Sequence, residues 1–315
     1  MKEAWRWLMR IVVLGAGALG SLYGGRLHGQ GAEVVLVDVW REHVEAINRN
    51  GLRIDGPEGT KVVHVPACLP QQVHEKADLV MIFTKTFHTQ EALEGIKTCL
   101  DDHTMLMTLQ NGLGNAERLL KYVEPHRIIV GTTSFPSDLM APGHIRSAQK
   151  GYTYIMRLDR QRSETLSHIG RLLDQAGFNC TVMEDVFPYI WEKVAFNSAL
   201  NSLAAVTRLT VGELGSNEHS KRLAQKVCAE VLGVAEKKGV AVSRERVQAM
   251  LEEAFRQHRD HQPSMLQDIL SGRRTEIEAI NGAVLKEARQ LGLEVPFTEC
   301  LYRLVKTIED HFRSS

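Results

Sequence analysis

The sequence predicts an α/β fold in which a parallel-sheet domain is followed by an all-helical C-terminal domain. From residue 10 to about 184, short β-branched runs alternate with helical patterns, beginning with "IVVLG", "ALGSLYGGRLHGQ", "EVVLVD" and "REHVEAINRN". Strands separated by helices in this order are typical of βαβ units around a parallel sheet. After "FNCTVME" at 178–184 the strand-like runs stop. We therefore expect two domains, residues 1–184 and 185–315, which suits a chain of 315 residues.

The remaining elements follow in order along the chain. "DLVMIFT", "TMLMTL" and "RIIVGTTS" are the next expected strands, and "DGPEG" within residues 51–66 indicates an inserted hairpin. In the second domain the pattern predicts helices over residues 186–207, 217–239, 244–260, 264–271, 275–292 and 296–312. Gly239, Gly272 and Gly292 stand where helices can end, and Pro296 where one can restart.

The composition restricts the class of partner. Lysine plus arginine and aspartate plus glutamate number 38 each, so the formal net charge is zero. We expect neither nucleic acid nor an anionic membrane as a partner, and we favour a small-molecule enzyme. The five cysteines form no C-x-x-C pair, which argues against disulfides and favours a reducing cytoplasm. His258 and His261 have a spacing that a metal could use, but no third ligand lies nearby in sequence, so we predict no metal site.

The ends and the hydropathy of the chain bear on its location. No stretch approaches the ~20 apolar residues needed to span a bilayer, so we expect a soluble, cytoplasmic protein. We interpret residues 1–8 as a leader, with Met9 as a plausible true start, because no signal-peptide pattern precedes the first strand. The sequence does not define an oligomeric state, although the apolar helical half could support a homodimer.

A glycine-rich loop, "GAGALG" at residues 15–20, joins the first expected strand to an apolar helix. In such a unit the three glycines permit a tight turn, a close approach of pyrophosphate and close helix packing. The helix N-terminus offers N–H donors to phosphate oxygens. Because a second strand then ends at an acidic residue, the sequence predicts a Rossmann-type dinucleotide site. Its predicted cofactor-binding residues are Gly15, Ala16, Gly17, Ala18, Leu19, Gly20 and Asp38.

Asp38 bears on the choice between the two nicotinamide cofactors. A carboxylate at the end of the second strand accepts hydrogen bonds from the ribose hydroxyls of NAD and repels the 2′-phosphate of NADP. Arg41 follows three residues later and could neutralise or bind that phosphate. The residues themselves leave the choice open.

The expected helix "WEKVAFNSALNSLAAV" at 191–206 carries Lys193, Asn197 and Asn201 at every fourth position. Positions four apart drift by only about 40° around a helix, so these three side chains share one face. The rest of the helix is almost wholly apolar, which indicates that protein covers it. Buried amides and ammonium groups need partners. The row is therefore either a catalytic or ligand-binding row or a structural polar network.

Together these motifs resemble the ketopantoate reductase family, whose members reduce the ketone of 2-ketopantoate with NADPH and combine a Rossmann domain with an all-helical domain. The resemblance runs from Met9 over nearly the whole chain. It rests on "GAGALG", "TKTFHTQ", "LQNGLGN", "WEKVAFNSALNSL" and "PSMLQDILSGRRTEIEAING", in that order. It implies a small-molecule 2-keto acid as substrate and NADP(H) as cofactor, with NAD(H) as the option raised by Asp38.

The resemblance also implies roles for residues of this chain. Lys193 would be the general acid that protonates the ketone oxygen, and Glu276 would orient it and contact the nicotinamide side of the cofactor. Asn197, Asn201 and Ser264 would bind substrate, with Ser264 holding its carboxylate. Lys85 and Asn111 would fix the nicotinamide half of the cofactor. Such roles suit the reaction, because hydride addition to a ketone builds negative charge on oxygen that a proton donor must neutralise.

Taken without the resemblance, several of these residues have simpler interpretations. Lys85 suits a surface position, Asn111 a turn, Ser264 a helix N-cap and Glu276 a solvated helix face.

Two departures from the family pattern bear on the substrate and the cofactor. Val211 stands where well-studied members carry an asparagine, and Asp38 replaces a commoner basic turn. The alternatives are an NADH-dependent D-2-hydroxyacid dehydrogenase acting on other branched 2-keto acids, and a nucleotide-sensing protein without catalysis. The presence of both Lys193 and Glu276 argues against a sensor, which needs neither a proton donor nor a carboxylate to orient it.

Overall fold

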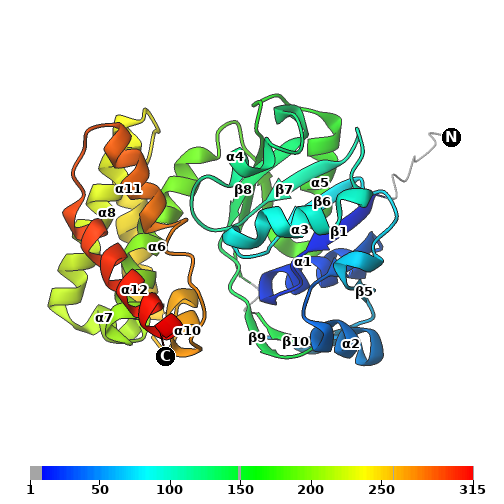
Figure 1. Ribbon diagram of the computed structural model, residues 1–315, viewed down its shortest axis with the longest axis horizontal. Helices are drawn as coiled ribbons and strands as arrows, with labels where there is room; N and C mark the ends of the chain where they lie inside the picture. The colour runs from blue at the N-terminus through cyan, green and yellow to red at the C-terminus, as the bar shows by residue number, and fades with distance from the viewer. Residues whose placement is uncertain (1–8, 148–149, 258, 315) are drawn as a thin grey trace. The chain divides into compact units, whose positions relative to one another are not determined.

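The structure is a computed structural model that describes residues 9–147, 150–257 and 259–314. The chain forms two compact units (Figure 1). Among the described residues, the first comprises 9–110 and 115–186, and the second comprises 111–114 and the residues from 187 onward. The proposed leader, residues 1–8, lies outside the described residues, as does His258.

The first unit is built on a twisted sheet with helices packed on it. Within the described residues, the sheet has eight strands in the order β12-β11-β8-β7-β6-β1-β2-β5. Neighbouring strands run parallel except β11 and β8, which pair antiparallel. The strands are β1 (Arg10–Leu14), β2 (Glu33–Val37), β5 (Ala67–Cys68), β6 (Leu79–Ile82), β7 (Met105–Thr108), β8 (Ile128–Thr133), β11 (Thr153–Arg157) and β12 (Cys180–Val182).

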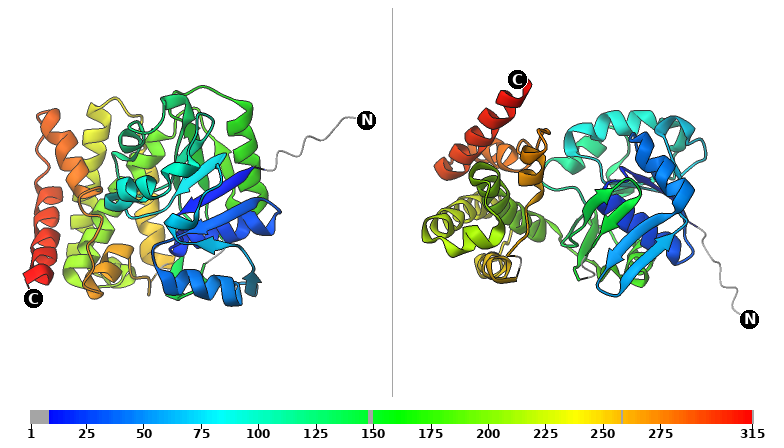
Figure 2. Two further views of the ribbon diagram at one scale, coloured as in Figure 1. Left: turned by 45° about the vertical axis from the view of Figure 1, so that its right-hand side comes forward. Right: turned by 90° about the horizontal axis from the view of Figure 1, so that it is seen from below.

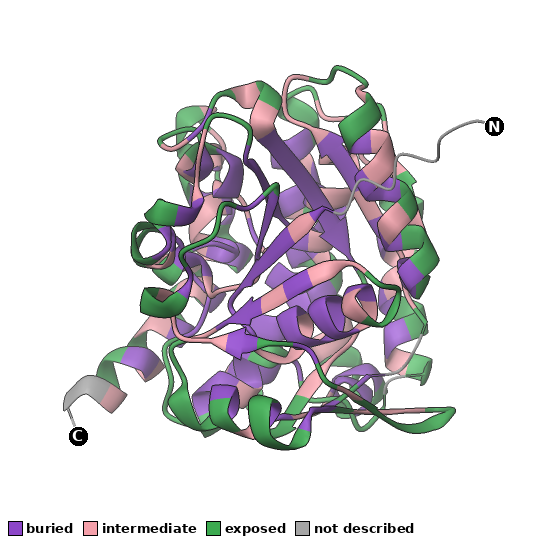
Figure 3. Ribbon diagram, turned by 90° about the vertical axis from the view of Figure 1, so that its right-hand side faces the viewer, coloured by how far each residue is buried: buried purple, intermediate pink, exposed green. Residues whose placement is uncertain are grey.

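The helices of this unit are α1 (Ala18–Gly29), α2 (Arg41–Asn50), α3 (Thr89–Gly95), α4 (Asn115–Leu119) and α5 (Glu164–Leu173). Strands β1, β6 and β7 are buried almost throughout, as their unbroken apolar runs require when both faces of a parallel sheet are covered (Figure 3). Leu22 and Leu27 of α1 join Ile11, Leu36 and Met81 in the core. The parallel sheet predicted from the alternating pattern is confirmed.

The predicted hairpin at residues 51–66 is also present. β3 (Leu52–Gly56) pairs antiparallel with β4 (Gly59–Val63). The two strands extend into a second, smaller sheet, because β10 (His144–Arg146) pairs with β3 and β9 (Asp138–Ala141) pairs with β10.

The second unit consists of helices packed on one another (Figure 2). They are α6 (Phe187–Thr207), α7 (Val211–Ser216), α8 (Glu218–Lys237), α9 (Arg244–Gln257), α10 (Ser264–Leu270), α11 (Asn281–Gln290) and α12 (Pro296–Ser314). α6 is buried nearly all round, and its Val194, Leu200 and Leu203 contribute to the core. The all-helical character predicted for this region is confirmed.

Two details of the helical unit differ from the predicted elements. The short helix α7 was not expected, and it begins with a capping box in which Thr210 and Glu213 exchange hydrogen bonds. The helix expected over residues 275–292 begins only at Asn281, because residues 276–280 form a bend and turns. No described helix is long and apolar enough to cross a membrane.

Candidate active site

The glycine loop follows β1 at the carboxyl edge of the larger sheet. Gly15 has φ +94°, and a Cβ there would lie 2.6 Å from the backbone nitrogen of Thr84. A Cβ on Gly20 would lie 2.0 Å from the carbonyl oxygen of Gly15. Both positions therefore require glycine, one for its backbone conformation and one for the close approach of helix and strand.

The start of α1 is open in the way that a dinucleotide phosphate requires. Gly17 is the N-cap of α1 and provides no side chain to cap the helix. Apart from Gly17, its two chain neighbours and the adjacent helix backbone, no described atom lies within 4 Å of the position that a Cβ on Gly17 would take. Because the first N–H groups of a helix lack partners within the helix, this open N-terminus can bind an anion. The loop thus fits the pyrophosphate of a nicotinamide dinucleotide.

A chain of buried hydrogen bonds supports the glycine loop at residues 15–20. The Ser21 hydroxyl donates to the Ala16 carbonyl at 2.6 Å, and His43 Nε2 lies 3.3 Å from Ser21 Oγ. The Gly143 N–H donates to His43 Nδ1 at 3.0 Å, so the neutral ring carries its proton on Nε2 and donates it to Ser21. Burial lowers the pKa of His43, which favours this neutral form, while the Asp38 charge opposes the shift. The sequence analysis did not identify Ser21 or His43.

Asp38 lies directly after β2, as predicted. It is half-buried, and its Oδ1 accepts the Trp40 N–H at 2.9 Å, which fixes the carboxylate at the strand end. Arg41 is exposed at the first position of α2.

Lys85 follows β6 at the same edge of the sheet. It is half-buried and precedes a 3-10 turn, Thr86–His88. The side-chain amide of Gln110 braces this loop, donating to the Thr84 carbonyl at 2.7 Å and to Thr89 Oγ1 at 2.9 Å. Because parallel strands end at one edge, the structure gathers the glycine loop, Asp38 and Lys85 there.

In the helical unit, α6 carries the polar row of Lys193, Asn197 and Asn201. Asn197 and Asn201 are each only 7% exposed, and Lys193 is half-buried. Burial lowers the pKa of the Lys193 ammonium to about 8, although the negative charge of Glu276 opposes this shift. A lysine with this pKa can donate a proton at neutral pH more readily than an exposed one.

Glu276 is not the solvated helix residue that its sequence neighbours suggest. It is 8% exposed and lies in the irregular segment before α11, from which its charge acts on Lys193. The start of this segment is anchored to α12, because the Thr275 N–H and hydroxyl both donate to Glu309, each at 2.7 Å. The two residues predicted to be catalytic therefore lie within range of each other's charge.

The other predicted residues of this unit lie on three different segments. Ser264 is exposed at the first position of α10, where Pro263 is the N-cap, so Ser264 does not cap this helix. Asn111 is half-buried and belongs to the helical unit, because the neighbouring Leu113 N–H donates to the Ala279 carbonyl at 2.8 Å. Val211 is buried at the start of α7.

Metal chemistry finds no support in the described part of the chain. No group of three or more histidine, cysteine, aspartate or glutamate side chains there could hold a metal ion. The paired histidines of "HRDH" are not tested by this observation, because His258 lies outside the described residues.

Comparison with known proteins places the chain in a class. The family described as ketopantoate reductase PanE/ApbA matches residues 11–160, and the C-terminal part of the same family matches residues 185–309. The chain belongs to the ketopantoate reductase family and is an NAD(P)-dependent oxidoreductase.

Individual relatives agree along the whole length. The 2-dehydropantoate 2-reductase of Streptococcus pyogenes serotype M1 is 30% identical over 302 residues, covering 96% of this chain and 98% of the relative. The structure of 2-dehydropantoate 2-reductase from Geobacter metallireducens has a TM-score of 0.90 and 30% identity, covering 95% of this chain and 99% of that one. The structure of D-mandelate dehydrogenase with NADH and anilino(oxo)acetate has a TM-score of 0.92 and 28% identity, covering 97% and 100%.

Proposed function

We propose that the protein is a 2-dehydropantoate 2-reductase, which reduces the C2 ketone of 2-ketopantoate to give pantoate. The observation that carries the proposal is the α6 row, in which a half-buried lysine of lowered pKa precedes two buried asparagines and is influenced by the charge of Glu276. This arrangement suits a 2-keto acid, whose reduction requires a proton donor at the ketone oxygen. The curated relatives that bear this name support the substrate.

In this proposal each catalytic or substrate-binding residue has a distinct role. The bound nicotinamide cofactor supplies a hydride to C2 of the substrate. Lys193 donates a proton to the ketone oxygen, so that hydride and proton together give the alcohol and leave Lys193 neutral. Asn197 and Asn201 bind the substrate, and Ser264 binds its carboxylate. Glu276 orients the Lys193 ammonium.

The cofactor site of the proposal has its own set of residues. The loop from Gly15 to Gly20 holds the pyrophosphate, and Lys85 and Asn111 fix the nicotinamide half. We further propose that NADH serves at least as well as NADPH. The fixed Asp38 carboxylate would meet a 2′-phosphate at close range, whereas Arg41 is exposed and need not compensate. The structurally similar D-mandelate dehydrogenase, whose structure contains NADH, is consistent with use of NADH.

A second candidate is an NADH-dependent D-2-hydroxyacid dehydrogenase acting on other branched 2-keto acids. Val211 favours it, because a buried valine stands where a polar substrate contact is expected from the resemblance. The D-mandelate dehydrogenase neighbour shows that this fold also serves an enzyme of that name.

Steady-state kinetics with a panel of 2-keto acids, each tested with NADH and NADPH, decides between the candidates. We expect the highest kcat/KM for 2-ketopantoate. A preference of about tenfold or more for another branched 2-keto acid would favour the second candidate. Absence of reduction with every member of the panel would contradict both.

A further inference from the structure

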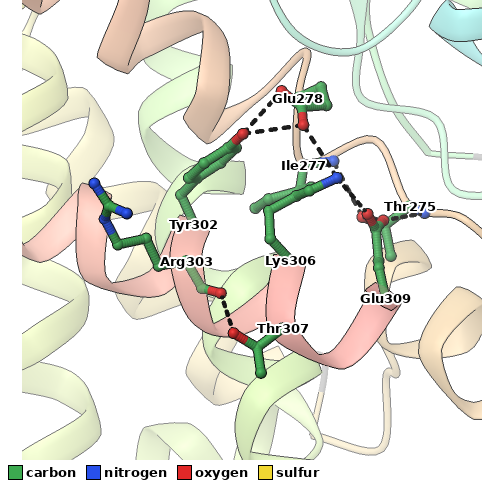
Figure 4. Close-up of polar contacts among 8 residues, drawn as sticks. All are labelled: Thr275, Ile277, Glu278, Tyr302, Arg303, Lys306, Thr307 and Glu309. Atoms are coloured by element: carbon green, nitrogen blue, oxygen red, sulfur yellow. Dashed lines mark hydrogen bonds and ion pairs between the residues drawn. The ribbon is translucent and has the colours of Figure 1, made fainter. Parts of the chain in front are cut away.

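The segment that carries Glu276 is held by a buried carboxylate of the last helix. Glu309 on α12 is 3% exposed, and its Oε1 accepts both the Thr275 N–H and the Thr275 hydroxyl at 2.7 Å (Figure 4). The Thr275 hydroxyl in turn accepts the Ile277 N–H at 3.1 Å. The residues on both sides of Glu276 are therefore bound into one network that ends on Glu309.

A second set of contacts fixes the same segment at Glu278. Lys306 of α12 bridges Glu309 Oε2 at 3.1 Å and Glu278 Oε1 at 3.2 Å, and the Tyr302 hydroxyl lies 3.0 Å from Glu278 Oε1. Burial alone would raise the pKa of Glu309, but the bonds from Thr275 and the Lys306 charge outweigh it and hold the pKa below its usual value. Glu309 is therefore ionised at neutral pH.

The far end of the segment is tied to the helix that carries Lys193. Asn281 is fully buried and donates from Nδ2 to the Ser198 carbonyl on α6 at 3.2 Å. Ile277 and Ile280 pack in one apolar cluster with Ala205 of α6 and Val305 of α12. The turn segment thus lies between α12 and α6, and α12 supplies its charged contacts.

This arrangement has a cost that packing alone does not explain. A buried carboxylate is expensive unless it is hydrogen-bonded and paired with a cation, as Glu309 is by Thr275 and Lys306. The Thr275 and Ile277 N–H groups both find side-chain acceptors, which Glu309 and Thr275 provide. What the irregular backbone achieves is the placement of Glu276.

We propose that Glu309 is a positioning residue for the reaction: it anchors Thr275 and thereby keeps the Glu276 carboxylate beside Lys193. This inference rests on the proposed roles of Lys193 and Glu276. It adds a residue of α12 that touches neither substrate nor cofactor.

The test compares two anchors of the same chemistry. Glu309→Gln and Thr275→Val weaken the anchor at Glu276. Glu230→Gln and Thr298→Val weaken a matched anchor at the start of α12, where Glu230 Oε2 accepts the Thr298 N–H at 2.8 Å and the Thr298 hydroxyl at 2.7 Å. Thr275→Val keeps the size of the side chain but removes the hydroxyl that joins Glu309 to the Ile277 N–H. Circular dichroism and thermal melts establish that each variant is folded.

The first readout is the pH dependence of kcat/KM for reduction. Because Glu276 raises the pKa of Lys193, loosening Glu276 lowers it further. We expect the alkaline midpoint to fall by roughly half a pH unit or more in Glu309→Gln and less in Thr275→Val. Because the wild-type midpoint lies near pH 8, a shift of half a unit lowers kcat/KM at pH 8 about twofold in Glu309→Gln. The Glu230 and Thr298 variants keep the wild-type midpoint even where they melt earlier.

The second readout requires no turnover. Competitive labelling with acetic anhydride across pH, read by mass spectrometry, measures the pKa of Lys193 itself in the four variants and the wild type. A folded Glu309→Gln protein whose Lys193 titrates as in the wild type would overturn the inference, as would an equal shift in Glu230→Gln. If the wild type reduces no 2-keto acid, the proposed function fails, and the labelling result still decides whether Glu309 positions Glu276.

Discussion

The two units hold their functional residues by different means. In the sheet unit the main chain does most of the positioning, through Gly15, Gly17 and Gly20 at the edge of parallel strands. In the helical unit, buried charged side chains do it, because Glu276 lies on turns anchored by Glu309. A site made from backbone is sensitive to the addition of single atoms, whereas a site made from buried charges is sensitive to protonation and to the loss of a partner.

The largest effect on stability and cofactor binding is expected for substitution of Gly20, whereas substitution of Gly17 in the same loop should affect cofactor binding alone. Gly20→Ala places a Cβ 2.0 Å from the Gly15 carbonyl oxygen, so we expect a loss of stability of roughly 1–3 kcal/mol together with loss of cofactor binding. Gly17→Ala meets no described protein atom within 4 Å, so the protein stays as stable but its cofactor affinity falls, because the methyl group occupies the space open to phosphate. Thermal melts and titration of NADH fluorescence measure both. Equal destabilisation in the two variants would contradict the geometry described for the loop.

An intermediate effect is expected at Asp38, where the sheet unit does use a charge. Asp38→Ala and Asp38→Asn should both shift the ratio of kcat/KM toward NADPH by about tenfold, because each removes a like charge from the 2′-phosphate position. Asp38→Asn keeps an acceptor for the Trp40 N–H and thus isolates the charge from the loop geometry. Steady-state kinetics with both cofactors provides the ratio. A wild-type enzyme that prefers NADPH by a hundredfold or more would show that Arg41, not Asp38, governs this pocket.

The smallest effect is expected at His43, which acts on the glycine loop through Ser21. His43→Gln should raise the KM for the cofactor about fivefold with little change in kcat, because roughly 1 kcal/mol of hydrogen bonding to the loop is lost. Ser21→Ala should behave in the same way. A drop in kcat at unchanged cofactor KM would mean that the chain from Gly143 to Ala16 does not support cofactor binding.

The sequence predicted what local patterns encode. The glycine loop, the acid at the end of β2 and the row on α6 are each encoded in a short stretch of sequence, and the structure forms the predicted elements around them. The sheet followed by helices was likewise readable from the change of period near residue 184.

What the sequence did not predict depends on partners far along the chain. Residues 275–280 have a helical pattern, but they form a bend and turns, and Thr275 binds Glu309, which lies 34 residues away. His43 looks like an ordinary helix residue until Gly143, 100 residues away, donates to its ring. Periodicity carries no information about such acceptors, so Glu309 and His43 were missed and the start of α11 was placed too early.

The most direct test of the account is the pH dependence of kcat/KM for 2-ketopantoate in the wild type and in Lys193→Ala. kcat/KM reports the free enzyme, in which burial lowers the pKa of Lys193 to about 8. Since only the protonated lysine can donate, the wild-type value should be highest below that pH and fall tenfold per unit above it. Lys193→Ala should bind cofactor normally, lose at least about 10²-fold in kcat and lack this alkaline limb. A flat wild-type profile up to pH 10, or near-wild-type turnover by folded Lys193→Ala, would contradict the assignment of Lys193 as the proton donor.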